Sequence, residues 1–173
     1  MTEAPPVEVM IDIETLGTTP GSAILEIAAA AFYPCGTIAR EFETRISLLD
    51  SIAQGFTVDP STAAWHLRRL SAVAPYGPTV WQSLCRLRLW LDDIGPRPIW
   101  AWGMDFERTM LEAAYHRIHS PLPWKYHHGN DARTVWNLAF PGKHRPPRDH
   151  NALADVRDQI RDLTQARQSL LLQ

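Results

Sequence analysis

The sequence predicts an α/β fold in which helices flank a mixed, five-stranded sheet. Three strand-like segments come first, and helical patterns with two further short strands follow them. The chain of 173 residues suits a single domain, residues 1–173, because no repeat, low-complexity tract or long linker divides it. Hydrophobic residues at 45% and charged residues at 21% are typical of a folded protein with a sizeable core.

The first third of the chain contains the three strand patterns. Val7–Ile13 is mostly apolar and predicts a buried strand, and Ala23–Tyr33 is apolar enough for a second central strand. A turn at Pro34–Gly36 leads to Thr37–Ser47, whose side chains alternate in polarity. We therefore expect these three strands to form an antiparallel meander.

Helical patterns dominate the rest of the chain. Asp59–Leu70 opens with DPST, which places proline in a first helical turn, and Thr79–Asp93 has apolar residues at helical spacing. The remaining elements, in chain order, are a short strand at Pro98–Trp102, a helix from about Phe106 to His119, a short fifth strand, a helix at Asp131–Ala139 and a long helix at Ala152–Leu172.

Cysteine content and hydropathy indicate the cellular compartment. Cys35 and Cys85 are too few for a disulfide framework or a cysteine-rich zinc site. No stretch approaches the roughly 20 apolar residues that span a bilayer. The opening MTEAPPVEV lacks the basic and apolar regions of a signal peptide. We expect a cytoplasmic protein with no membrane partner.

Charge is distributed unevenly along the chain. The net charge is only −2, but residues 1–50 carry eight acidic residues against two arginines. Residues 117–150 carry six Lys or Arg against two Asp, together with five histidines. An acidic cluster facing a basic rim would suit a metal site that receives a polyanion. On charge alone, scattered solvated side chains are the more common explanation.

The first candidate motif is Asp12-x-Glu14, at the end of the first strand pattern. Strand side chains alternate between faces, so these two carboxylates project from the same side. Like charges on one face of a core strand repel each other, and a divalent cation such as Mg²⁺ or Mn²⁺ removes the conflict. The alternative for an isolated D-x-E pair is an exposed strand end.

A second motif, DHNALADV, contains His150 and Asp155. Five residues apart, they would lie about 140° from each other on a continuous helix. A helix that begins near Asn151 or Ala152 would instead leave His150 on the preceding loop, where it could swing over Asp155 and take a proton from water. Both residues are also ordinary features of a helix N-terminus.

A third motif, WAWGMDFERTML, offers two acids that flank Phe106. Asp105 would serve as a helix N-cap without any other function. Glu107 in a first helical turn would likewise be favoured by the helix dipole alone.

Together, the three motifs resemble the DEDDh 3′→5′ exonucleases, the superfamily of RNase T, oligoribonuclease and polymerase proofreading subunits. IDIETLG, DPSTAAWHL, GMDFERTML and DHNALADV look most like the phage-type exonuclease A group and similar mycobacterial exoribonucleases. The resemblance spans roughly residues 7–160 and implies a ribonuclease-H-like fold.

The resemblance also implies roles for individual residues. Asp12, Glu14 and Asp155 would hold two Mg²⁺ or Mn²⁺ ions, with Asp12 bridging them, and His150 would be the general base. In the family the middle motif ends in an aromatic residue and Asp, whereas this chain has Phe106-Glu107. Either Glu107 replaces that aspartate or Asp105 takes over. We favour Glu107, as a catalytic and metal-binding residue, because it occupies the motif position.

Substrate contacts follow from the same resemblance. Leu16 would pack against the terminal nucleotide, and backbone near Thr15 would touch the 3′ end. Trp65 lies on a helix that borders the substrate groove in the resembling group, so it could stack on a base, although a Trp on an amphipathic helix is more often a core residue. His127-His128 lacks a spaced third ligand for zinc.

The resulting hypothesis is a 3′-5′ exonuclease that acts on single-stranded DNA or RNA 3′ ends and releases nucleoside 5′-phosphates. Several relatives are dimers, so a homodimer is an open expectation. One alternative is a nucleic-acid-binding module whose catalysis is weakened or lost because of Glu107. Another is a phosphoesterase acting on a small nucleotide. No motif reads the 2′-hydroxyl, so the choice between RNA and DNA stays open.

Overall fold

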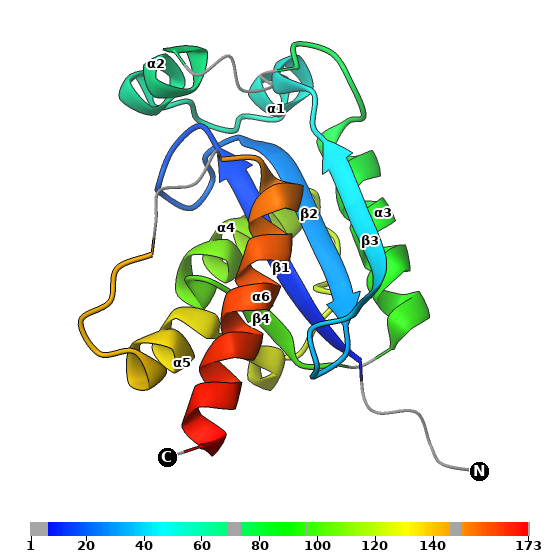
Figure 1. Cartoon of the computed structure of the whole chain (residues 1–173). Helices are drawn as coiled ribbons and strands as arrows, with labels where there is room; N and C mark the ends of the chain where they lie inside the picture. Colours follow the sequence, from blue (N-terminus) through cyan, green and yellow to red (C-terminus); the bar gives the residue numbers. More distant parts are fainter. Residues whose placement is uncertain (1–6, 69–73, 96, 146–149, 173) are drawn as a thin grey trace.

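The computed structural model describes residues 7–68, 74–95, 97–145 and 150–172. The strands (Figure 1) are β1 (Glu8–Thr15), β2 (Ile24–Phe32), β3 (Ile38–Arg45), β4 (Ile99–Ala101) and β5 (Gly129–Asp131). The helices are α1 (Leu48–Ala53), α2 (Pro60–Arg68), α3 (Val80–Ile94), α4 (Met104–Arg117), α5 (Ala132–Ala139), α6 (Ala152–Leu171) and a 3₁₀ turn, η1 (Tyr126–His128). None of the described helices has the length and apolar character that a membrane span requires.

The five strands form one mixed sheet in the order β3-β2-β1-β4-β5. Strand β2 pairs antiparallel with both β1 and β3, whereas β4 pairs parallel with β1 and with β5. The predicted α/β class, the five-stranded mixed sheet and the antiparallel meander are therefore confirmed. The carboxyl ends of the three mutually parallel strands, β1, β4 and β5, meet at one edge of the sheet.

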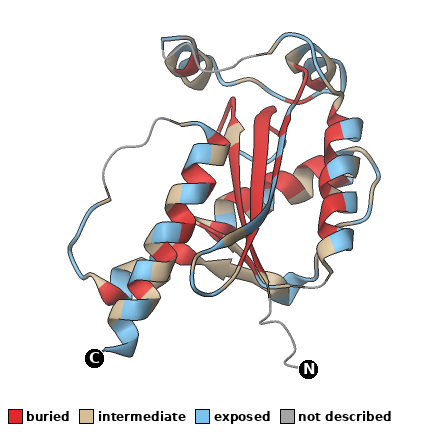
Figure 2. Ribbon diagram, turned by 45° about the vertical axis from the view of Figure 1, so that its right-hand side comes forward, coloured by how far each residue is buried: buried red, intermediate tan, exposed pale blue. Residues whose placement is uncertain are grey.

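The alternation of side chains along β1 divides the core into two layers. Val9, Ile11 and Ile13 belong to the larger cluster, which includes the buried faces of α3 and α4. Met10 belongs to the second cluster, which includes α5 and α6. Since Asp12 and Glu14 share the parity of Met10, they project toward the α6 side. In Figure 2 the buried residues of α3 and α6 lie on their sheet-facing sides.

Small side chains let α6 lie close to the sheet. Ala28 and Ala30 of β2 are fully buried in the same cluster as Val156 and Ile160 of α6. Figure 1 shows α6 running across β1 and β2, with its N-terminal end near the tip of β1. The packing of α6 therefore carries its first turn to the edge of the sheet where Asp12 and Glu14 lie.

Two boundaries differ from the prediction. Strand β1 continues past Ile13 to Thr15, because its pairing with β2 extends through Glu14 opposite Glu26. Helix α4 begins at Met104 rather than Phe106, because a distant carboxylate accepts the Met104 N–H.

Helix α1 was not predicted. It begins after Ser47, whose hydroxyl accepts the Asp50 N–H (3.2 Å), and it is only six residues long. Leu70, in the predicted second helix, and Asp149, in the DHNALADV motif, lie outside the described residues.

Candidate active site

An open cleft of about 830 Å³ lies at the carboxyl edge of β1. Its walls come from the end of β1, from α2, from the first turn of α4, from α5 and from the first two turns of α6. The structure brings five predicted catalytic residues into this cleft: Asp12, Glu14, Glu107, His150 and Asp155.

Asp12 and Glu14 reach the cleft from one face of β1. The Asp12 carboxylate is 8% exposed, and its Oδ1 accepts a hydrogen bond from Gln159 Nε2 (2.6 Å). Gln159 was not predicted, although it lies four residues after Asp155 and therefore on the same stripe of α6. This spacing is the signal that could have identified it.

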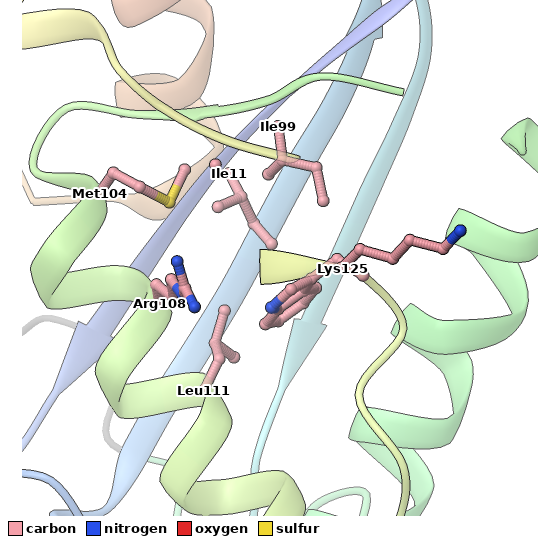
Figure 3. Close-up of a pocket in the computed structure, with 8 residues that line it drawn as sticks. Ile11, Ile99, Met104, Arg108, Leu111 and Lys125 are labelled. Carbon is pink, nitrogen blue, oxygen red and sulfur yellow. The ribbon is translucent and has the colours of Figure 1, made fainter. Parts of the chain in front are cut away.

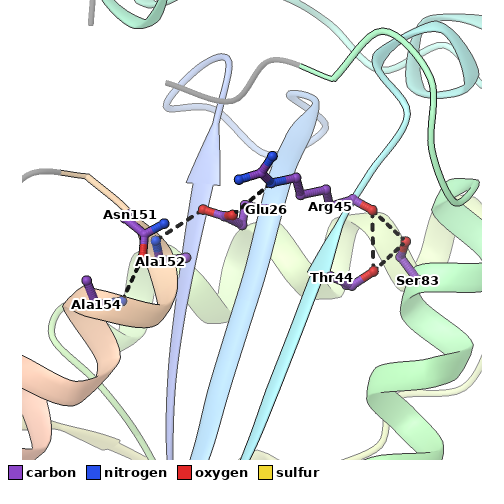
Figure 4. Close-up of polar contacts among 7 residues, drawn as sticks. All are labelled: Glu26, Thr44, Arg45, Ser83, Asn151, Ala152 and Ala154. Carbon is purple, nitrogen blue, oxygen red and sulfur yellow. Dashed lines mark hydrogen bonds and ion pairs between the residues drawn. The ribbon is translucent and has the colours of Figure 1, made fainter. Parts of the chain in front are cut away.

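The N-terminus of α6 is tied to the sheet, as Figure 4 shows. Asn151 caps the helix by accepting the Ala154 N–H (2.9 Å), and Glu26 of β2 accepts the Ala152 N–H (3.2 Å). A carboxylate at this position also interacts favourably with the helix dipole. Asp155 follows within the first turn, so the same two bonds hold it against β1. An acid in the otherwise apolar strand β2 marked Glu26 as unusual, yet the sequence analysis did not single it out.

His150 lies on the loop just before α6, which is the placement that brings it near Glu14. Its φ of +54° is uncommon for a residue other than glycine and turns the chain into the helix. His150 Nδ1 lies 3.9 Å from Glu14 Oε1, and the Trp65 ring packs edge-on against the imidazole with 4.5 Å between centroids. The side chain is 39% exposed and so remains accessible to water in the cleft.

The carboxylates crowd one another electrostatically. Burial, followed by repulsion from Asp12, Asp155 and Glu26, raises the pKa of Glu14 to about 8. Burial and then repulsion from Asp12 raise the pKa of Glu107 to about 8, while Arg133 acts in the opposite direction. Asp12 is thus the leading charged neighbour of both glutamates.

Glu107, rather than Asp105, is the middle acid in the cleft. Glu107 is 7% exposed and lines the cleft, whereas Asp105 is exposed and lines a separate hollow between the starts of α4 and α5. The expected N-cap role of Asp105 is wrong, because α4 starts at Met104 rather than Phe106 and Gly103 is its N-cap. Asp131 accepts the Met104 N–H instead (3.0 Å), a contact between segments 27 residues apart.

The donor set fits a hard divalent cation. Ligand atoms of Glu14, His150 and Asp155 all lie within 4.8 Å of one another. Glu107 Oε2 is buried with no hydrogen-bond partner among the described residues, so a cation would satisfy it. Among the described residues, Glu14, His150 and Asp155 form a cluster of potential ligands close enough to share one cation. His127 and His128 do not belong to it.

The predicted substrate contacts are only partly placed in the cleft. Thr15 and the half-buried Trp65 line it. Leu16 does not: its side chain is 1% exposed and belongs to the core cluster that includes residues of α3 and α4, and its contact with a nucleotide stays a prediction. From the basic segment 117–150, Arg133 and Arg145 line the cleft. His66, 2% exposed and bordering Glu14, was not assigned a role from the sequence.

A second pocket lies beside β4 and α4 (Figure 3). Ile99, Met104 and Leu111 line it with Ile11, on the sheet face opposite Asp12. Its volume of about 10 Å³ admits about one water molecule, so it cannot accept a nucleotide.

Comparisons with known proteins agree with this geometry. The family model described as the 3′-5′ exoribonuclease Rv2179c-like domain matches residues 7–166. Apo exonuclease I matches with a TM-score of 0.71 and 17% identity over 96% of this chain and 43% of that one. The zinc-bound complex of E. coli exonuclease I with single-stranded DNA matches with a TM-score of 0.70 and 17% identity, over 95% and 42%. No curated protein matches. The chain spans less than half the length of these structures, and at this identity the likeness establishes the fold.

Proposed function

Because the chain belongs to the 3′-5′ exoribonuclease Rv2179c-like domain family, we propose that it removes nucleotides one at a time from the 3′ end of single-stranded RNA. The DEDDh-type resemblance and the ribonuclease-H-like fold expected from the motifs are confirmed by the family match and the structural neighbours. The observation that carries the proposed activity is the single cleft in which carboxylates from β1, α4 and α6 meet His150.

Two Mg²⁺ or Mn²⁺ ions are part of the proposal, with Asp12, Glu14, Glu107 and Asp155 as the residues that would hold them. When bound, such ions polarise the scissile phosphate and stabilise the leaving 3′-oxygen. Asp12 is the leading charged neighbour of both Glu14 and Glu107, which supports its assignment as a ligand in the same cluster. The longer side chain of Glu107 reaches the cleft from the first turn of α4, which supports its replacement of the family's aspartate.

His150 is proposed as the general base. Its imidazole takes a proton from water, the water oxygen bonds to phosphorus, and the bond from phosphorus to the 3′-oxygen of the preceding nucleotide breaks. The leaving 3′-oxygen takes up a proton from solvent, so the products are a nucleoside 5′-phosphate and an RNA chain with a new 3′-hydroxyl. Glu14 Oε1, 3.9 Å from His150 Nδ1, would stabilise the imidazolium that forms.

The lining of the cleft supports a single-stranded substrate. Trp65, Trp102 and Phe106 contribute aromatic rings, and Arg68 and Arg133 contribute positive charge. Unpaired bases stack on aromatic side chains, and cations neutralise the phosphates between them. RNA is proposed because the family is described as an exoribonuclease, although the structural neighbours include complexes of exonuclease I with single-stranded DNA.

The experiment is a digestion of 5′-labelled RNA and DNA oligonucleotides of one sequence, each with Mg²⁺, Mn²⁺ or EDTA. We expect an RNA ladder that shortens by single nucleotides, no cleavage in EDTA, and none by Asp12→Asn, because removing its charge disturbs both ion positions. Asp105→Asn, an exposed acid on the same protein, serves as the control and should cut normally. Undiminished cleavage in EDTA contradicts the metal-dependent mechanism. RNA binding without cleavage under any cation supports the module with lost catalysis instead, and preferential cleavage of DNA overturns the choice of RNA.

A further inference from the structure

Helix α2 forms one wall of the cleft but is attached through few buried groups. Asp59 caps the helix by accepting the Thr62 N–H (2.8 Å). Among the described side chains of α2, only His66 is buried, at 2% exposure. Trp65 and Arg68 line the cleft and are half-buried or exposed. Among the described side chains of α2, His66 is therefore the most deeply buried, and the partly buried Ala63 also packs against the core.

The His66 imidazole meets the end of β1 at the metal-binding edge. Its Nε2 lies 3.0 Å from the Thr15 carbonyl oxygen and 3.9 Å from Glu14 Oε2. A carbonyl oxygen can only accept, so Nε2 carries the hydrogen and donates it. The pairing of β1 with β2 is irregular between Glu14 and Thr15, and the His66 bond ties this point of β1 to α2.

Trp65, the residue before His66, packs against the two histidines that lie on either side of Glu14. Its ring packs edge-on against His66 (4.8 Å between centroids) and against His150 (4.5 Å). The Glu14 carboxylate thus has Oε2 toward His66 and Oε1 toward His150, each 3.9 Å from an imidazole nitrogen. One dipeptide of α2 borders both the proposed metal ligand and the proposed base.

From this geometry we propose that His66 is a positioning residue, whose Nε2–H holds the end of β1 so that the Glu14 carboxylate keeps its orientation. Buried partners of this kind commonly tune metal ligands, and their loss lowers metal affinity or activity by about 10–100-fold. His66 acts through Thr15 and Glu14 and needs no contact with RNA. The proposal rests on the proposed function for its kinetic readout, but its metal-binding readout is independent of RNA cleavage.

The test compares His66→Phe, which fills the space without a donor, with His66→Asn, which restores an N–H. His116→Phe, at an exposed histidine of α4, is the matched control. Calorimetry measures Mn²⁺ affinity without RNA, steady-state digestion measures kcat and KM, and urea unfolding confirms folding. We expect His66→Phe to bind Mn²⁺ about 10–100-fold more weakly and to lose kcat with KM little changed. His66→Asn should recover much of both.

A folded His66→Phe protein with the parent's Mn²⁺ affinity and kcat would overturn the proposal. Should His66→Phe fail to fold, His66→Asn and His66→Ala decide: higher Mn²⁺ affinity in the Asn variant supports the donor role, and equal affinities overturn it. A parent protein that binds Mn²⁺ but cuts no RNA contradicts the proposed function, while the affinity comparison still tests His66.

Discussion

Replacing Glu107 with Gln should change stability and activity in opposite directions. In the metal-free protein the ionised carboxylate is unfavourable, because it is buried beside Asp12 and its pKa is raised to about 8 from 4.5. The folded state therefore binds more protons than the unfolded state between these two values. Stability from this group is fully present below about pH 4.5 and is lost as the pH rises through about 8.

The size of the effect follows from the pKa difference. Each pH unit inside this window lowers the free energy of unfolding by up to about 1.4 kcal/mol for one group. Between about pH 5.5 and about pH 7.5, Glu107 should remove about 2 to 3 kcal/mol of stability from the metal-free parent. Glu107→Gln cannot ionise, so its stability should decline less over the same interval by that amount.

The assay is urea unfolding in EDTA at several pH values within this window. Asp105→Asn is the control, because Asp105 is exposed on the same helical turn and its substitution should leave the parent's pH slope unchanged. In Mg²⁺, Glu107→Gln should lose most RNA cleavage, whereas Glu107→Asp should retain it. Parallel pH slopes for the parent and Glu107→Gln would refute the reasoning that burial and repulsion act on this carboxylate.

Three further predictions concern His150, the N-cap of α6 and the turn between β2 and β3. His150→Ala should lower turnover by about 10²–10⁴-fold in RNA digestion while Mn²⁺ affinity persists in calorimetry, and near-normal turnover would show that His150 is not the base. Asn151→Ala should cost about 1 kcal/mol in urea unfolding, with Asn151→Ser close to the parent, because the side chain caps α6. Gly36→Ala should cost about 1 kcal/mol or more, since φ is +92° and the new Cβ would lie 2.9 Å from Thr164 Oγ1; an unchanged unfolding midpoint would contradict this.

The architecture could be predicted because its signals are local. Apolar runs in β1 and β2 and helical spacing in α3 and α6 depend on neighbours within a few residues, and the structure reproduces them. The motifs around Asp12 and His150 were also local, so the two ends of the site were recognised before their proximity was known. The end of β1 was misplaced because strand pairing with Glu26 prolongs it beyond the apolar run.

The choice between Asp105 and Glu107 illustrates what local sequence leaves open. Both acids suit a first helical turn, and only the start of α4 decides which of them faces the cleft. That start depends on Asp131, which lies at the end of β5 and accepts the Met104 N–H. Leu16 shows the same limit, because its side chain enters the core although Thr15 and Thr18 on either side of it line the cleft.

The sequence by itself determined the α/β class, the order of the elements and the three motifs that indicated a metal-dependent nuclease. Only the tertiary structure decided which groups surround each carboxylate: Gln159 on Asp12, Glu26 at the start of α6, and His66 beside Glu14. These contacts join residues 52 to 147 positions apart. Periodicity encodes which face a side chain occupies, but its partner is set by how helices and strands pack, and that packing depends on the whole chain at once.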